Sequence, residues 1–98
     1  MSDNIIGPAF WSRVDGIINL ANTQCDTSDP TEVGASTLFA SARFNTFLFA
    51  KGMGSAANMT AERERALEYF TGQFREMMTA NFDDFIKNFD AYMLPDPQ

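Results

Sequence analysis

Two polar residues, Arg43 and Asn45, stand out as candidates for binding a small molecule. They lie in the least charged stretch of the chain, residues 33–50, in which Arg43 is the only charged residue. A guanidinium in apolar surroundings needs a carboxylate or carbonyl partner, because an unpaired buried charge is very costly. One interpretation is a pocket for a small carboxylate or phosphate. The other is an ion pair, with Asp15 or with an acid of the following helix, that fixes helix register; we favour it because no second basic residue lies nearby to share an anion.

Other arrangements that could carry catalysis or bind a metal are missing from the sequence. The chain contains no histidine, which excludes Ser-His-Asp and Cys-His nucleophiles and imidazole metal sites. The single cysteine, Cys25, has no histidine to activate it, and the helical acids lack the Glu-x-x-His motif of carboxylate metal sites in bundles. Asp83 and Asp84 are adjacent, so on a helix they point about 100° apart and do not converge. The sequence predicts no catalytic residue, metal or cofactor, and therefore a protein that is not an enzyme.

Length and charge narrow the class of protein further. The 98 residues suffice for one domain, and 13 acidic against 7 basic residues give a net charge of −6. This acidity argues against a nucleic-acid partner, because affinity for nucleic acid depends on clustered Lys and Arg. The start of the chain does not resemble a secretory signal, one cysteine cannot form an internal disulfide, and residues 33–50 are short for a membrane span. We therefore expect a cytoplasmic protein with no membrane segment.

Hydrophobic periodicity and helix-capping residues predict three helices, at about residues 8–25, 30–51 and 60–93. In the first, apolar residues recur at helical spacing along one face. The second follows Asp29, a favourable N-cap, and Pro30, which suits the first helical position. The third follows a connection of small residues, with Thr60 or Asn58 as its cap.

The third helix is long for the domain that contains it. At 1.5 Å per residue it extends about 50 Å, whereas a compact chain of about 100 residues has a diameter of roughly 33 Å. Either the helix breaks near Asn81 into a fourth short helix, or it stays whole and its aromatic end packs against another chain. In both cases we predict an all-α fold, a three-helix antiparallel bundle in a single domain, with flexible ends at residues 1–7 and 94–98.

The aromatic end of the third helix supplies four candidate interface residues. Large aromatic side chains are enriched in protein interfaces. The leading hypothesis is therefore a protein that self-associates, as a symmetric homodimer, through Phe82, Phe85, Phe89 and Tyr92. The alternative is a small-anion or small-ligand binding module centred on the arginine and asparagine described above. A third hypothesis is that the acidic face of the chain, which includes Asp83, Asp84 and Asp90, docks on a basic partner or imitates a nucleic acid.

A set of short motifs in a fixed order extends over nearly the whole chain. They are Phe10-Trp11-x-Arg13-Val14-Asp15, Leu20-Ala21-Asn22, Ala42-Arg43-Phe44-Asn45-x-Phe47, Ala66-Leu67-Glu68-Tyr69-Phe70, Asn81-Phe82-Asp83-Asp84-x-Ile86 and Asn88-Phe89-Asp90-x-Tyr92-Met93. Together they resemble a family of small bacterial proteins catalogued only as a domain of unknown function. The resemblance implies a free-standing small bacterial protein, and it transfers no activity and no functional residue.

Overall fold

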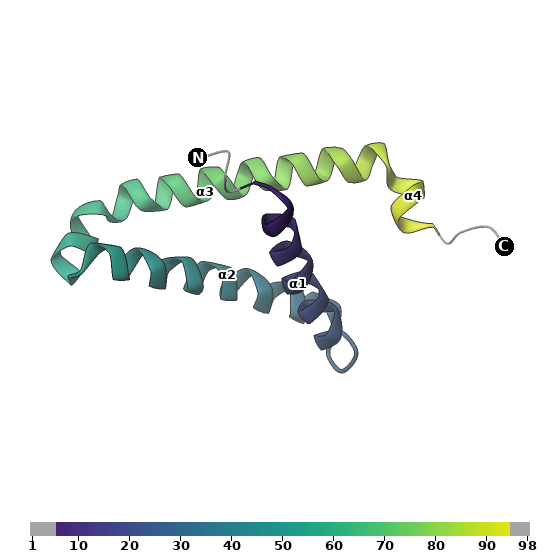
Figure 1. The fold of residues 1–98 in the computed structure, drawn as a ribbon, viewed down its shortest axis with the longest axis horizontal. Helices are drawn as coiled ribbons and strands as arrows, with labels where there is room; N and C mark the ends of the chain where they lie inside the picture. Colours follow the sequence, from purple (N-terminus) through teal and green to yellow (C-terminus); the bar gives the residue numbers. More distant parts are fainter. Residues whose placement is uncertain (1–5, 95–98) are drawn as a thin grey trace. The chain divides into compact units, whose positions relative to one another are not determined.

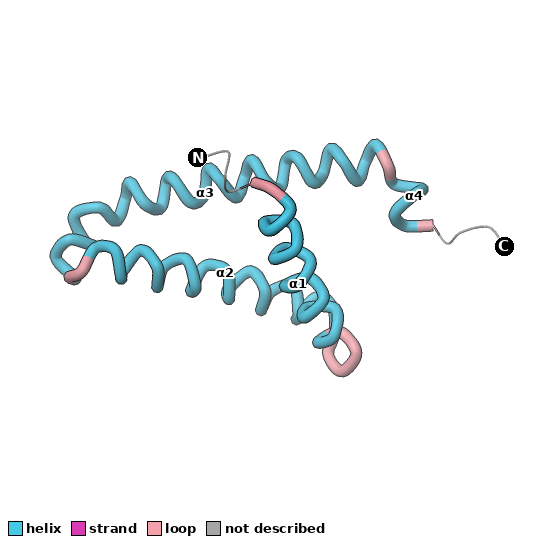
Figure 2. Tube along the Cα trace, viewed as in Figure 1, coloured by secondary structure: helices cyan, strands magenta, loops and turns pink. Residues whose placement is uncertain are grey.

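The computed structural model describes residues 6–94, which form four α-helices and no strand (Figure 1, Figure 2). The helices are α1 (Pro8–Gln24), α2 (Pro30–Met53), α3 (Ala56–Lys87) and α4 (Phe89–Met93). The predicted all-α class is confirmed. Apart from residues 6, 7 and 94, the flexible ends expected at 1–7 and 94–98 lie outside the described residues. The chain divides into two units, residues 1–52 and residues 53–98.

α1 begins and ends close to where the sequence predicts. Pro8 occupies its first turn, where the missing N–H leaves no intrahelical bond unmade. At the other end the Cys25 N–H donates to the carbonyl oxygens of Ala21 and Asn22, each at 3.1 Å, which tightens the last turn. The helix ends at Gln24, one residue before the predicted end.

α2 begins at its predicted cap but runs beyond its predicted end. Asp29 Oδ1 accepts a hydrogen bond from the Thr31 N–H at 2.8 Å, as an N-cap does. The helix continues to Met53, and Gly54 then takes a left-handed conformation with φ of 79°. The predicted end at residue 51 is wrong because the residue that turns the chain is Gly54, which has no Cβ to clash in this conformation.

The start of α3 corrects a second prediction. Ser55 caps the helix, since its Oγ accepts a hydrogen bond from the Asn58 N–H at 3.1 Å. Asn58 lies inside the helix, and its side-chain amide donates to the Met53 carbonyl at 2.8 Å. Thr60 also lies inside, with its hydroxyl donating to the Ala56 carbonyl at 2.9 Å. Neither predicted cap is correct, because Gly54 and Ser55 complete the connection in two residues.

The break in the long helix is real but lies seven residues beyond the predicted one. At Asn81 the helix is continuous, and the side-chain amide of Asn81 donates to the Met77 carbonyl at 2.7 Å. The helix ends at Lys87, and Asn88, with φ −113° and ψ 26°, separates it from the single turn and a half of α4. Both sequence alternatives are therefore corrected: α3 does not break at Asn81, and it does not run whole to residue 93.

Replacing Gly54 with alanine tests the left-handed turn between α2 and α3. We expect Gly54→Ala to lower the free energy of unfolding by about 1–2 kcal/mol, because an L-residue in this conformation brings its Cβ close to a carbonyl oxygen. Gly72→Ala is the matched control, because Gly72 lies inside α3 and no atom lies within 4 Å of a Cβ built there. It should raise the free energy of unfolding by about 1 kcal/mol. Urea denaturation measures both, and equal effects of the two substitutions would contradict the assigned turn.

Candidate interaction surface

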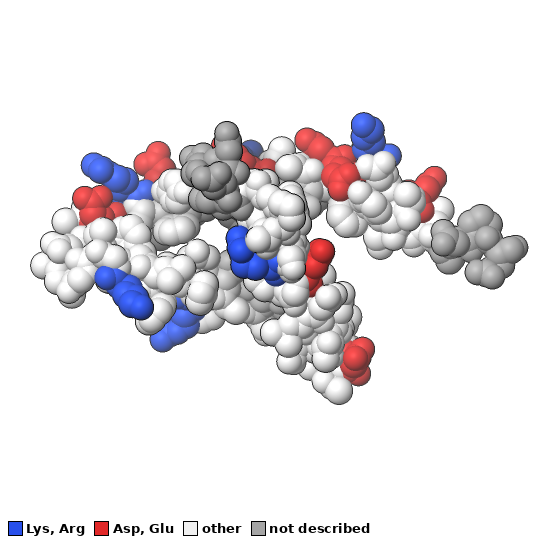
Figure 3. All heavy atoms as spheres, viewed as in Figure 1, with Lys and Arg blue, Asp and Glu red and all other residues white. Residues whose placement is uncertain are grey.

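An apolar stripe runs along one face of α3. Its residues recur at intervals of three or four, so each lies about one helical turn from the next. The stripe consists of Leu67, Phe70, Phe74, Met78, Phe82 and Phe85. Charged residues of α3 gather along a different edge, as the space-filling view shows (Figure 3). α3 is therefore strongly amphipathic.

Most of the apolar surface of each unit is open. Val33, at 8% exposure, is the only buried hydrophobic residue among residues 6–94. The stripe residues of α3 are between 37% and 61% exposed, and large apolar side chains of α1 and α2, such as Trp11 and Phe44, are more than half exposed. An ordinary domain hides such side chains, because each one removed from water contributes about 1.5–3 kcal/mol.

A shallow recess lies beside the middle of the stripe. Phe74, Met78 and Phe82 form its apolar part, and Arg75 and Asp83 flank them with opposite charges. All of these residues belong to α3, and Thr71 and Thr79 complete the lining. An apolar centre with a polar, charged rim is the usual composition of a protein interface.

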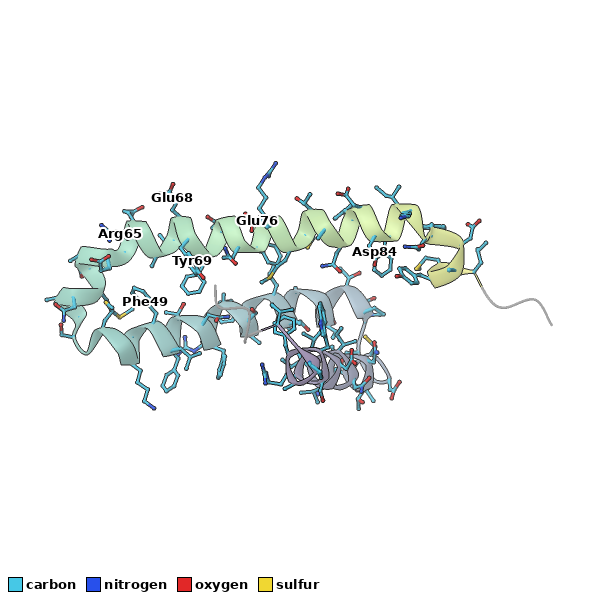
Figure 4. The ribbon with its side chains drawn as sticks, turned by 45° about the horizontal axis from the view of Figure 1, so that its top comes forward. Phe49, Arg65, Glu68, Tyr69, Glu76 and Asp84 are labelled. Atoms are coloured by element: carbon cyan, nitrogen blue, oxygen red, sulfur yellow. The ribbon has the colours of Figure 1, made fainter. Side chains whose placement is uncertain are left out.

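α4 bends away from the line of α3 just beyond Asp84 (Figure 4), in the conformer here called folded-back. A cluster of four residues, Asp84, Phe85, Asn88 and Tyr92, holds this bend and is here called the clasp. The Tyr92 hydroxyl donates to the Asp84 carboxylate, with oxygen–oxygen distances of 3.1 and 3.2 Å. The Asn88 side-chain amide donates to Asp84 Oδ1 at 2.8 Å and to the Asp84 carbonyl at 3.2 Å. The rings of Phe85 and Tyr92 pack with their centroids 4.8 Å apart. Asp84 is therefore the common acceptor of the clasp.

The clasp perturbs the ionisation of Tyr92. The hydrogen bond to Asp84 favours the neutral phenol, and the negative charge of Asp84 opposes a second negative charge beside it. Both effects raise the pKa of Tyr92 above its ordinary value of 10.0. A group whose pKa is raised by folding contributes stability that is fully present below its unfolded pKa and is lost as pH rises through the folded pKa. The Tyr92 hydroxyl therefore keeps its proton, and can donate it to Asp84, at neutral pH, and this hydrogen bond is lost when Tyr92 ionises in alkaline solution.

The structure brings together two of the four predicted interface residues and leaves the other two open. Phe85 and Tyr92 contact each other, although each remains about half exposed. Phe82 and Phe89 are 61% and 53% exposed. From the sequence, Asp84 was considered only as a neighbour of Asp83 and as part of the acidic face, and was not identified as a hydrogen-bond acceptor. The signal was present, because Asp84, Asn88 and Tyr92 recur every fourth residue and so share a helical face.

The predicted ligand pair on α2 is placed on the surface. Arg43 is exposed and makes no hydrogen bond or ion pair with any of the described residues, Asp15 included. Asn45 is partly buried and uses its side-chain amide to donate to the Ser41 carbonyl at 2.8 Å. The two residues do not converge on a shared site, and their role in anion binding stays a prediction.

The structure offers little for other chemistry. Among residues 6–94, no three Cys, Asp or Glu side chains lie close enough together to hold a metal ion. None of the described helices combines the length and the apolar character that crossing a membrane requires. The exposed apolar stripe and the clasp at its end are therefore the features that most need a functional explanation.

Removing the Asp84 carboxylate tests the clasp. In a Tyr69→Phe background Tyr92 is the only tyrosine, so the absorbance of tyrosinate follows its ionisation alone. We expect Asp84→Ala to bring the pKa of Tyr92 down toward 10.0, because the hydrogen bond to Asp84 and its charge, the two largest causes of the shift, are lost. Asp90→Ala is the control. It also removes one negative charge, but from α4, and the Asp90 carboxylate makes no hydrogen bond with the Tyr92 hydroxyl. A Tyr92 titration that Asp84→Ala leaves unchanged would show that the clasp does not form.

Comparison with known proteins places the chain in a family. No curated protein and no solved structure matches it. A family model described as "Protein of unknown function (DUF3144)" matches residues 10–86, which include all of α2 and nearly all of α1 and α3. The chain therefore belongs to the DUF3144 family of proteins of unknown function.

Proposed function

We propose that this protein acts by self-association, as a homodimer formed through the apolar stripe of α3 and the aromatic rings of α4, and that it is not an enzyme. The observation that supports the proposal is the exposure of a continuous apolar face on a helix of 32 residues. Amphipathic helices in water derive most of their stability from packing of the apolar face. A face that is half open in one unit therefore requires a cover.

The exposed area is close to what a stable dimer needs. Seven side chains of α3 and α4 are between 41% and 61% exposed: Leu67, Phe74, Met78, Phe82, Phe85, Phe89 and Tyr92. Since a large apolar side chain has about 200 Å² of surface, they offer about 700 Å² in each protomer. A standard interface buries about 800 Å² per partner. The stripe and its extension on α4 are therefore large enough to serve as one interface.

The charges beside the stripe favour a second copy of the chain as the occupant. Arg75 and Asp83 lie two turns apart beside the same recess. In an antiparallel pair of α3 helices related by a two-fold axis near Thr79, Arg75 of each copy lies at the same level along the pair as Asp83 of the other and on the same side, with Asp83 farther from the stripe. An isologous interface needs this kind of self-complementarity. The same axis places Met78 near the centre, with Phe74 and Phe82 on either side.

The sequence features noted above support the remaining parts of the proposal. The single cysteine cannot form a disulfide within the chain, so folding needs no oxidising compartment. We propose a cytoplasmic location on that ground. The net charge of −6 keeps the dimer soluble while the uncharged stripe is buried.

A substitution in the stripe tests the dimer directly. We expect the unmodified protein to have twice the chain mass of 10.9 kDa at micromolar concentration, measured by size-exclusion chromatography with light scattering. Phe82→Asp should raise the dissociation constant by about thirtyfold or more, because losing a buried aromatic anchor costs about 2 kcal/mol or more. Circular dichroism of each variant establishes that the helices are retained.

Tyr69→Asp is the matched control for this experiment. Tyr69 is an exposed aromatic residue of the same helix, but it lies about 160° around the helix from Leu67. Its substitution should leave the mass doubled. A particle of 10.9 kDa in the unmodified protein, or equal dissociation by both variants, would defeat the proposal.

The proposed antiparallel arrangement has its own test. Asp83→Arg and Arg75→Asp should each weaken the dimer a few-fold, because exposed ion pairs contribute about 0.2–1 kcal/mol each. The protein with both substitutions should regain its affinity, since opposite charges again lie at the same level on the two copies. Additive weakening in the double variant would contradict the two-fold axis near Thr79.

A further inference from the structure

The break between α3 and α4 is confined to one residue. Asn88 has φ −113° and ψ 26°, whereas the residues on both sides are helical. Hydrogen bonds of the helical type still reach it from each side: the Asn88 N–H donates to the Asp84 carbonyl at 2.9 Å, and the Tyr92 N–H donates to the Asn88 carbonyl at 3.1 Å. A change in the backbone of Asn88 alone would therefore join α4 to α3 as one helix.

The apolar spacing passes through this break without a change of phase. Phe82, Phe85, Phe89 and Tyr92 follow one another at intervals of 3, 4 and 3 residues. In a continuous helix Phe89 and Tyr92 would lie within about 40° of the line through Leu67 and Phe85. They would then extend the stripe by two turns. A segment that served only to end a helix has no need of this spacing.

The interactions that hold α4 folded back are exposed and few. They are the hydrogen bonds to Asp84 and the contact between the rings of Phe85 and Tyr92. The side chains of Asp84, Phe85 and Tyr92 are all exposed, so water competes for the same hydrogen bonds. The folded-back conformer and the straight conformer therefore differ by only a small free energy, and a modest binding preference can exchange them.

We propose that α4 is a hinged switch at Asn88, in which the clasp holds the folded-back conformer and a second copy of the chain selects the straight one. In the straight conformer, Phe89 and Tyr92 continue the line of the stripe and so enlarge the proposed dimer interface. The inference rests on that proposed interface. The clasp thereby opposes self-association, because Tyr92 must leave Asp84 and Phe85 before the stripe is complete. Dimer formation and straightening of the helix are coupled.

Nuclear magnetic resonance of the full chain can test the switch. In the folded-back conformer the rings of Phe85 and Tyr92 give a cross-peak, and the Cα chemical shift of Asn88 is not helical. In a straight helix these rings are separated by a rise of about 10.5 Å, so the cross-peak disappears and the Asn88 shift becomes helical. We expect this change as the protein concentration rises through the dimer dissociation constant.

Two variants separate the clasp from the dimer. Asp84→Ala should produce the straight-helix signals at every concentration and lower the dimer dissociation constant several-fold. Asp90→Ala removes the same charge from α4, and the Asp90 carboxylate makes no hydrogen bond or ion pair within residues 6–94. It should leave both the signals and the affinity unchanged.

The outcomes distinguish the two proposals. If Asp84→Ala leaves the ring cross-peak and the Asn88 shift as they are, the clasp does not hold α4, and the inference is overturned whatever the oligomeric state. If the protein dimerises but its signals do not change with concentration, the coupling is overturned and the proposed dimer stands. If the protein stays monomeric, the proposed function and the coupling fall together, while the response to Asp84→Ala still decides whether the hinge exists.

Discussion

The half-exposed apolar stripe of α3 is the feature that most constrains an explanation of this structure. A helix of 32 residues extends about 48 Å, and one side of it is aromatic or aliphatic from Leu67 to Phe85. Each of these side chains contributes to stability only when it is covered. The hydrogen bonds that cap the helices cannot replace the stability gained by covering the stripe, because each cap contributes only about 1 kcal/mol.

Asp84 links the apolar stripe to the hydrogen bonds of the clasp. It faces away from the stripe, yet its carboxylate accepts hydrogen bonds from Asn88 and from Tyr92, whose ring rests on Phe85. One carboxylate thereby influences how a stripe residue is covered. Its neighbour Asp83 points about 100° away and lies beside the recess with Arg75. The two adjacent acids, which resemble a paired catalytic site in the sequence, therefore serve two different surfaces.

The sequence predicted those features that depend on local chemistry. The helix starts at Pro8 and Pro30 follow from proline at a first turn and from the Asp29 cap, and both hold in the structure. The start of α3 was missed because Ser55, Asn58 and Thr60 are all competent caps, and the choice among them depends on the conformation of Gly54. The break at Asn88 was missed because the apolar spacing continues through it. The surroundings of Arg43 could not be predicted, because an arginine in an apolar helix is compatible with either a buried pair or an open surface.

The missed break shows why periodicity alone cannot locate the end of this helix. Periodicity indicates which residues would share a face if the backbone were helical. By this criterion Phe89 and Tyr92 belong to the same face as the α3 stripe. The clasp uses the same Tyr92 in a different conformation, in which its hydroxyl finds an acceptor and its ring contacts Phe85. The sequence is compatible with both arrangements, and in the switch that we propose the covering of the stripe selects between them. In the proposed switch, the conformation of α4 therefore depends on what binds to α3.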